Sequence, residues 1–126
     1  MINELAKQIH KNAKDKGFYE KEKNIGEMLC LIHSEVSEAL EADRKGRYAN
    51  TEMLEKFKTD NTWKDNDMND TQAFIVCVKD TFEDELADIM IRVMDLAAFK
   101  GIDLEKHIQM KMRHNACREK YHGKKY

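Results

Sequence analysis

Hydrophobic positions along the chain repeat with a helical period. Four stretches carry the pattern, at about 2–17, 24–44, 81–100 and 103–121. In the first and last of them, apolar residues recur three and four positions apart with charged residues between, which is typical of amphipathic helices. These stretches predict an all-α protein.

The segment 81–100 is the most apolar part of the chain. From Leu86 to Phe99, eleven of fourteen residues are apolar, on every side of a helix, so we expect this helix to be covered by other protein. Its charged residues form a single stripe at spacings of three, four and three: Glu85, Asp88, Arg92 and Asp95. Buried charges are costly unless they are paired, hydrogen-bonded or bound to a metal. The stripe therefore requires partners.

The ends of the last two helices carry local signals. Asp80 or Thr81 can cap the central helix, with Asp84 three residues after Thr81 as in a capping box. Gly101 is expected to close that helix, and Asp103 to cap the next one.

A long polar segment at about 45–78 lies between the second predicted helix, 24–44, and the third, 81–100. Such a long irregular insertion is usually either functional or disordered, and a short helix is expected over 51–58. The apolar run 74–78 is compatible with a strand or a helix. Trp63 is either a packing anchor or part of a lid or stacking surface.

Composition limits the class of protein. A chain of 126 residues without proline, with 37% charged and 8% aromatic residues, is expected to form a single helical domain over 1–126. The formal charge of -2 argues against a general nucleic-acid-binding polycation. Three separated cysteines predict neither disulfides nor a zinc site, and no segment resembles a signal peptide or membrane span. A cytoplasmic protein is expected, with no membrane partner.

Two pairs of carboxylates carry candidate chemistry. Glu35 with Glu38, and Glu85 with Asp88, each lie one helical turn apart. If the two helices pack antiparallel with these pairs facing, four carboxylates converge, and their repulsion requires cations. Oxygen ligands suit magnesium, with manganese as a substitute, so a metal is the expected partner of the charged stripe. Alternatively, Glu35 and Glu38 belong to a solvated face; a di-iron site is disfavoured because only 119–122 has the Glu-x-x-His form.

A basic stripe on the last helix complements the acids. Lys111, Asn115 and Arg118 follow at spacings of four and three, and could hold a polyphosphate and a base edge. The alternatives are a solvated helix face, or contact with nucleic acid through the basic stretch 106–126, although nucleic acid is not the expected partner.

The three motifs in order, Glu35-x-x-Glu38, Glu85-x-x-Asp88 and Lys111-x3-Asn115-x2-Arg118, resemble the MazG-like members of the all-α nucleoside triphosphate pyrophosphohydrolases, which include dimeric dUTPases and dCTP pyrophosphatases. The resemblance covers roughly residues 20 to 126 and implies a four-to-five-helix bundle that forms a homodimer or homotetramer. It implies magnesium-dependent cleavage between the α and β phosphates of a nucleoside triphosphate, which releases a monophosphate and pyrophosphate.

The resemblance also assigns roles to residues. Glu35, Glu38, Glu85 and Asp88 would bind magnesium, and Glu38 would position or deprotonate the attacking water. Lys111 and Arg118 would hold phosphates, and Asn115 would contact the base or sugar.

The stretch between the acidic pairs is longer here than is usual in the family, so base preference does not carry over. Two other functions stay open. One is a non-catalytic helical module that binds nucleotide or nucleic acid with its basic C-terminal face; the other is a purely structural role in which the apolar helices form an oligomer interface.

Overall fold

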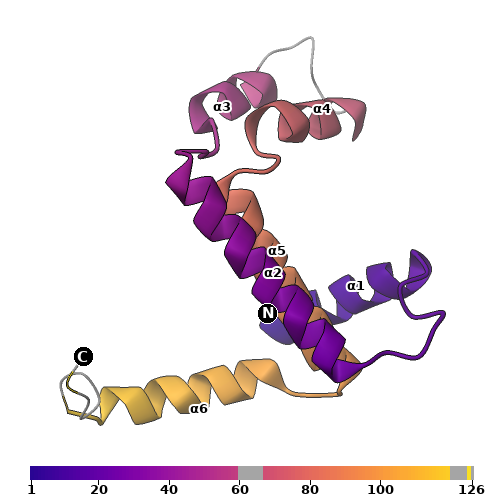
Figure 1. The fold of residues 1–126 in the computed structure, drawn as a ribbon, viewed down its shortest axis with the longest axis vertical. Coiled ribbons are helices and arrows are strands. Elements are labelled where there is room, and N and C mark those ends of the chain that lie inside the picture. Colours follow the sequence, from indigo (N-terminus) through magenta and orange to yellow (C-terminus); the bar gives the residue numbers. More distant parts are fainter. Residues whose placement is uncertain (60–66, 120–124, 126) are drawn as a thin grey trace. The chain divides into compact units, whose positions relative to one another are not determined.

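The computed structural model describes residues 1–59, 67–119 and 125, and within them the protein is all-α without strands (Figure 1). The prediction of an all-α protein is confirmed. The helices are α1 (Ile2–Asp15), α2 (Ile25–Arg44), α3 (Thr51–Thr59), α4 (Asp67–Cys77), α5 (Phe82–Phe99) and α6 (Leu104–Ala116). Six helices in the described residues exceed the expected four to five, because the segment 45–78 contributes two.

The chain forms two compact units. The central unit is Asn24–Arg92, and the terminal unit combines Met1–Lys23 with Val93–Tyr126. Helix α5 contributes its first part to the central unit and its last part to the terminal unit. The single domain over 1–126 stays a prediction.

In the central unit, α2 and the first part of α5 lie side by side and antiparallel (Figure 1). The backbone N–H of Phe82 donates to the carbonyl oxygen of Arg47 at 2.9 Å, and Arg92, ten residues later, reaches back to Glu35. Ala39 and Ala42 of α2 are buried. The hydrogen bonds at the two ends of this helix pair set the register that brings polar groups of α2 and α5 within reach of each other.

The long polar segment contains two helices, which follow a turn and a short irregular stretch at 45–50. The helix expected over 51–58 is confirmed as α3, and the run 74–78 falls mainly in α4. The two helices contact each other, and the N–H of Asn50 before α3 donates to the carbonyl oxygen of Cys77 at the end of α4, at 2.8 Å. Trp63 lies outside the described residues, so its two interpretations stay open.

Local signals set the helix ends as predicted. The side chain of Asn24 accepts from Glu27 N before α2, and that of Asp103 accepts from Lys106 N before α6. Thr81 Oγ1 accepts from Asp84 N at 3.4 Å, while the Asp84 carboxylate accepts from Asp80 N at 2.8 Å instead of from Thr81 N. This is a shifted form of the expected capping box.

The turn after α5 depends on a glycine. Gly101 has a φ of 67°, which a side chain rarely tolerates. Its N–H donates to Ala98 O and the N–H of Ile102 donates to Ala97 O, the two hydrogen bonds of a Schellman motif. Helix α6 ends at Ala116, earlier than the predicted Tyr121, in hydrogen bonds from Cys117 N and Arg118 N to carbonyls three residues back.

In the terminal unit, α1 contacts α6 through hydrogen bonds in both directions. The carboxylate of Glu105 accepts from the N-terminal ammonium group at 2.8 Å and from Ile2 N at 2.7 Å. Glu105 N in turn donates to Asn3 Oδ1 at 3.1 Å. These bonds satisfy N–H groups at the start of each helix, which have no partner within their own helix.

The buried apolar side chains of the described residues are small or medium-sized, and none of the large ones is fully buried. Several large apolar side chains of α2 and α5 are instead nearly half-exposed: Leu29, Val36, Leu40, Leu86, Met90 and Ile91. None of the described helices combines the length and the apolar composition that crossing a bilayer requires.

A candidate metal centre between two helices

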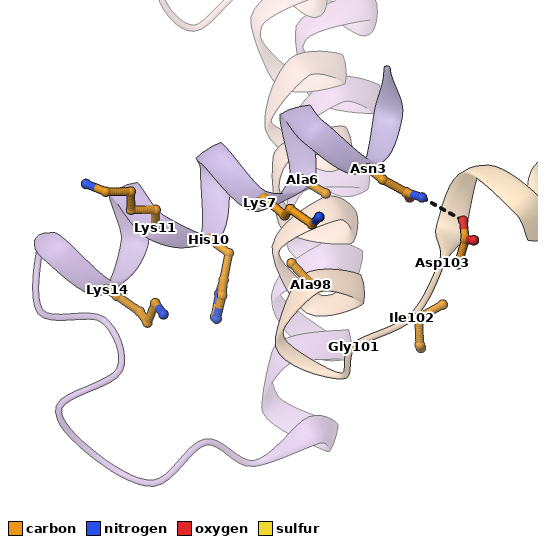
Figure 2. A pocket seen from close by; sticks show the side chains of 10 residues that line it. All are labelled: Asn3, Ala6, Lys7, His10, Lys11, Lys14, Ala98, Gly101, Ile102 and Asp103. Atoms are coloured by element: carbon orange, nitrogen blue, oxygen red, sulfur yellow. Dashed lines mark hydrogen bonds between the residues drawn. The ribbon is translucent and has the colours of Figure 1, made fainter.

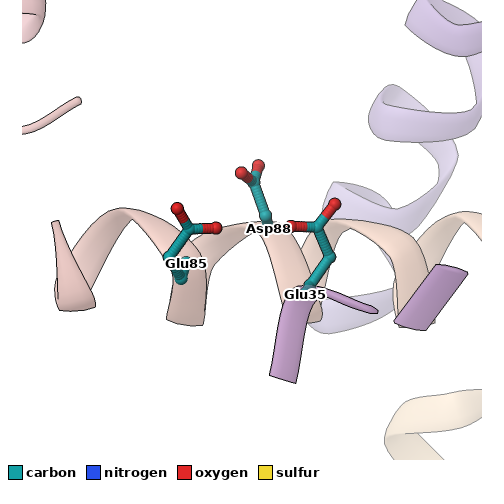
Figure 3. Close-up of side chains that lie close together, drawn as sticks. All are labelled: Glu35, Glu85 and Asp88. Atoms are coloured by element: carbon teal, nitrogen blue, oxygen red, sulfur yellow. The ribbon is translucent and has the colours of Figure 1, made fainter. Parts of the chain in front are cut away.

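Three carboxylates meet where α2 faces the first part of α5. One oxygen each of Glu35, Glu85 and Asp88 lies within 4.8 Å of the others. Figure 3 shows the three side chains, with Glu85 and Asp88 one turn apart on α5 and Glu35 reaching them from α2. The antiparallel packing therefore brings Glu35 of the first pair to both members of the second pair, whereas Glu38, the fourth predicted carboxylate, is not a member of this group.

Burial distinguishes the members of this acidic cluster. Glu35 and Glu85 are each only 7% exposed, and Asp88 is half-buried. Glu38, one turn after Glu35, is exposed. Two of the predicted ligands thus belong to the interior of the helix pair, and the solvated-face interpretation does not apply to Glu35.

The surroundings disfavour charge on two of these groups. Burial, reinforced by the charges of Glu38, Asp88 and Glu35, raises the pKa of Glu85 to about 7. Burial and the carboxylates of Asp84 and Glu35 likewise raise the pKa of Asp88. Within the described part of the chain, neither Glu85 nor Asp88 forms an ion pair. Negative charge at this site is therefore poorly compensated by the protein.

Glu35 differs because it has a cationic partner. Arg92 Nε donates to Glu35 Oε1 at 2.7 Å. Burial alone would raise the pKa of Glu35, but hydrogen bonds with Glu38 and Arg92 outweigh it and lower that pKa. Arg92 thus keeps Glu35 ionised and fixes one of its oxygens.

Glu38 interacts with Glu35 from the solvent side. The hydrogen bond that it shares with Glu35, together with the charge of Glu35, raises the pKa of Glu38. Glu38 is therefore an accessible carboxylate that is more basic than an ordinary surface glutamate.

A second group of three carboxylates also contains Glu85. Carboxylate oxygens of Asp80, Asp84 and Glu85 also lie within 4.8 Å of one another. Asp84 already accepts a hydrogen bond from Asp80 N as part of the cap of α5. The spacing of the sequence gave no reason to include Asp80 or Asp84, whose capping role accounts for them.

The donor set of Glu35, Glu85 and Asp88 fits a hard divalent cation. All three groups offer oxygen ligands, which suit magnesium or manganese better than zinc or copper. Two of the groups are almost buried, and one cation, Arg92, contacts one of them. A divalent ion would supply the positive charge that this site lacks.

The predicted substrate residues lie in the terminal unit. Lys111 and Asn115 are on α6, and Arg118 follows its end. Lys111 is exposed, Arg118 is half-buried, and the side-chain oxygen of Asn115 is buried without a hydrogen-bond partner among the described residues. These three residues thus belong to a different unit from the acidic cluster. His122, four residues after Arg118 in the sequence, lies outside the described residues.

The far end of the charged stripe corrects one expectation. A metal was expected as the partner of the whole stripe, but Asp95 is bound by protein groups. Its Oδ1 lies 2.8 Å from His10 Nδ1, and its Oδ2 accepts from the Tyr19 hydroxyl at 2.6 Å. The Tyr19 ring also packs against Phe99, with ring centroids 5.2 Å apart. Asp95 is therefore part of a structural cluster of the terminal unit.

Sequence reasoning also missed the role of Arg92. Its position four residues after Asp88 is visible in the sequence, but its partner is Glu35, 57 residues away. Only the register of α2 against α5 brings them together.

Comparison of the chain with protein-family models, with curated proteins and with solved structures finds no match.

Proposed function

We propose that this protein is a magnesium-dependent nucleoside triphosphate pyrophosphohydrolase, as its MazG-like motifs imply. The observation that carries the proposal is the meeting of Glu35, Glu85 and Asp88 within 4.8 Å, with two of them only 7% exposed. Acidic groups in such a position are strained by their own repulsion, and a bound cation relieves that strain.

Glu35, Glu85 and Asp88 would hold the metal, with Glu38 completing the set from the solvent side. Magnesium at such a site supplies Lewis acidity and neutralises phosphate charge. Arg92 positions Glu35 and keeps it ionised. The raised pKa of Glu38 suits it to take the proton from an attacking water, and its exposure leaves it accessible to that water.

Lys111, Asn115 and Arg118 are proposed to bind the nucleotide. The ammonium and guanidinium groups would hold phosphate oxygens, and the amide would contact the base or sugar. The side-chain oxygen of Asn115 supports this role, because it is buried without a hydrogen-bond partner among the described residues, and such an atom is costly unless something donates to it.

We also propose a homodimer or homotetramer. The large apolar side chains of α2 and α5 are nearly half-exposed in the single chain, and a partner subunit would cover them. Light scattering at micromolar concentration tests this: a dimer or tetramer is expected, and a monomer contradicts it.

The activity test is pyrophosphate release from a pool of nucleoside triphosphates, with magnesium and with EDTA. We expect release with magnesium, equimolar nucleoside monophosphate as the second product, and none with EDTA. Glu38→Gln should lower the rate about 100-fold or more, since removing a general base costs at least that much. Glu41→Gln, one turn further on the exposed side of α2, is the matched control and should leave the rate unchanged.

Binding of nucleotide without release of pyrophosphate under either condition would instead identify a non-catalytic binding module. Full activity in Glu38→Gln would remove Glu38 from the mechanism.

A further inference from the structure

The terminal unit contains a pocket that the proposed activity does not use. Its volume is about 460 Å³, within the range of small-molecule sites. One face of α1 forms one wall, and the turn between α5 and α6 forms the other (Figure 2). The lining residues are Asn3, Ala6, Lys7, His10, Lys11, Lys14, Ala98, Gly101, Ile102 and Asp103.

Small residues leave this pocket open. Ala6 is buried at its base, and a Cβ added to Gly101 would meet nothing within 4 Å. Ala98 and Ile102 add apolar surface. Gly101 is required by the turn after α5, so the same residue that ends the helix leaves space for a ligand.

The wall formed by α1 is cationic. Lys7, Lys11 and Lys14 follow at spacings of four and three, where like charges on a helix repel each other. Lys11 pairs with Asp15 at 2.8 Å, outside the pocket. Within the described residues, Lys7 and Lys14 have no ion pair. Figure 2 shows Lys14 extending from α1 in the same direction as His10, whereas Lys11 extends away.

The lining carboxylate does not neutralise these lysines. Asp103 Oδ1 accepts from Asn3 Nδ2 at 2.6 Å and from Lys106 N at 3.0 Å, so it is held in the cap of α6. The hydrogen bond from Asn3 lowers the pKa of Asp103, and the group stays ionised at neutral pH. The pocket thus has a cationic wall on α1, apolar surface from Ala98 and Ile102, and an end at which Asn3 and Lys106 N hold the negative charge of Asp103.

We propose that this pocket binds a small organic phosphate monoester. Its phosphate group would lie between Lys7 and Lys14, because several ammonium donors match a tetrahedral dianion better than a flat monoanionic carboxylate. Its organic part would cover Ala98 and Ile102. Binding would relieve the repulsion along α1.

The test is an NMR titration of the full chain with phenyl phosphate, in EDTA and at constant ionic strength. EDTA keeps divalent ions from the acidic cluster, so failure here is distinguishable from failure of the proposed activity. We expect saturable shifts of amide signals confined to residues 3–14 and 98–103. Inorganic phosphate should bind more weakly because it lacks the apolar part, and benzoate more weakly still.

The double variant Lys7→Gln with Lys14→Gln should weaken binding about tenfold or more, since each removes a cationic donor. The double variant Lys7→Arg with Lys14→Arg should retain binding and shows that the helix tolerates substitution. The control, Lys21→Gln with Lys79→Gln, removes the same charge away from the pocket and should change affinity less than about twofold.

Shifts that do not saturate, equal binding of benzoate, or equal losses in the pocket and control variants would overturn the proposal.

Discussion

The two ends of the charged stripe on α5 solve the same physical problem differently. Each places carboxylates on a helix that is otherwise apolar. At Asp95 the terminal unit supplies two partners, with His10 2.8 Å from one oxygen and the Tyr19 hydroxyl 2.6 Å from the other. At Glu85 and Asp88 the central unit supplies another carboxylate, Glu35, within 4.8 Å. The first arrangement is complete in the protein, and we propose that a cation completes the second.

The pKa values express this contrast. Burial and the hydrogen bond to Asp95 raise the pKa of Tyr19, so the phenol keeps its proton and remains a donor. Burial and neighbouring carboxylates raise the pKa of Glu85, so that charge is resisted there. A charged residue in an apolar helix therefore indicates a functional site only when the protein itself offers it no donor.

The largest expected effect is in the acidic cluster, at Asp88. Asp88→Asn keeps the size of the side chain but removes a charged ligand, so pyrophosphate release with magnesium should fall about 100-fold or more while the fold persists. Rates per folded molecule, with circular dichroism as a check on folding and Glu41→Gln as the control, measure this. An Asp88→Asn protein of normal activity would place the metal elsewhere.

Next is the structural end. Asp95→Ala should lower the free energy of unfolding by about 3 kcal/mol, because it leaves two partly buried partners without an acceptor. Asp15→Ala removes only an exposed ion pair with Lys11 and should have a much smaller effect on stability. Urea unfolding compares the two. A similar small loss in both would mean that the cluster around Asp95 contributes little.

A pH-dependent effect of opposite sign is expected at Glu85. Its pKa rises from 4.5 in the unfolded chain to about 7 in the folded protein, so the folded state binds the proton more tightly. The contribution to stability is complete below pH 4.5 and is lost as pH rises through 7. In EDTA, Glu85→Gln should therefore be more stable than the wild type at pH 8, by about 2 kcal/mol, and about equal to it near pH 4.5.

Thermal unfolding of both proteins across this pH range, with and without magnesium, checks that prediction. Magnesium should stabilise the wild type at pH 8 and do little for Glu85→Gln. A variant that is less stable than the wild type at pH 8 in EDTA would show that the Glu85 charge is compensated after all.

The smallest effect is at Tyr19. Tyr19→Phe keeps the ring against Phe99 but removes one donor to Asp95, while His10 remains. The expected loss is about 1.5 kcal/mol, typical of a hydrogen bond to a charged group. Urea unfolding of Tyr19→Phe in the Asp95→Ala background should show almost no further loss; an additive loss would mean that the hydroxyl acts through another partner.

Most helix ends were predictable because their causes are local. Asn24, Thr81, Gly101 and Asp103 each act within a few residues of the chain, and each lies at the predicted boundary. Helix α4 was less predictable, since its apolar run is short and its helical form is accompanied by burial of Ala73 and Cys77 beside α3.

The acidic cluster was predictable for a related reason. The spacing of each carboxylate pair is local. Only one assumption, that the two helices pack antiparallel with the pairs facing, was needed to predict that they meet. The partners of Arg92 and Asp95 were not predictable from local spacing. Glu35 is 57 residues from Arg92, and His10 is 85 residues from Asp95. The sequence therefore indicated which charges need partners, while the packing determined which of them find a protein partner.

Manganese binding followed by electron paramagnetic resonance tests the central claim most directly. We expect saturable binding of Mn²⁺ to the wild-type chain and to Glu41→Gln, displacement by Mg²⁺, and loss of binding in Glu85→Gln and Asp88→Asn. Unchanged Mn²⁺ binding in both of these variants, or none in the wild type, would contradict a metal centre between α2 and α5.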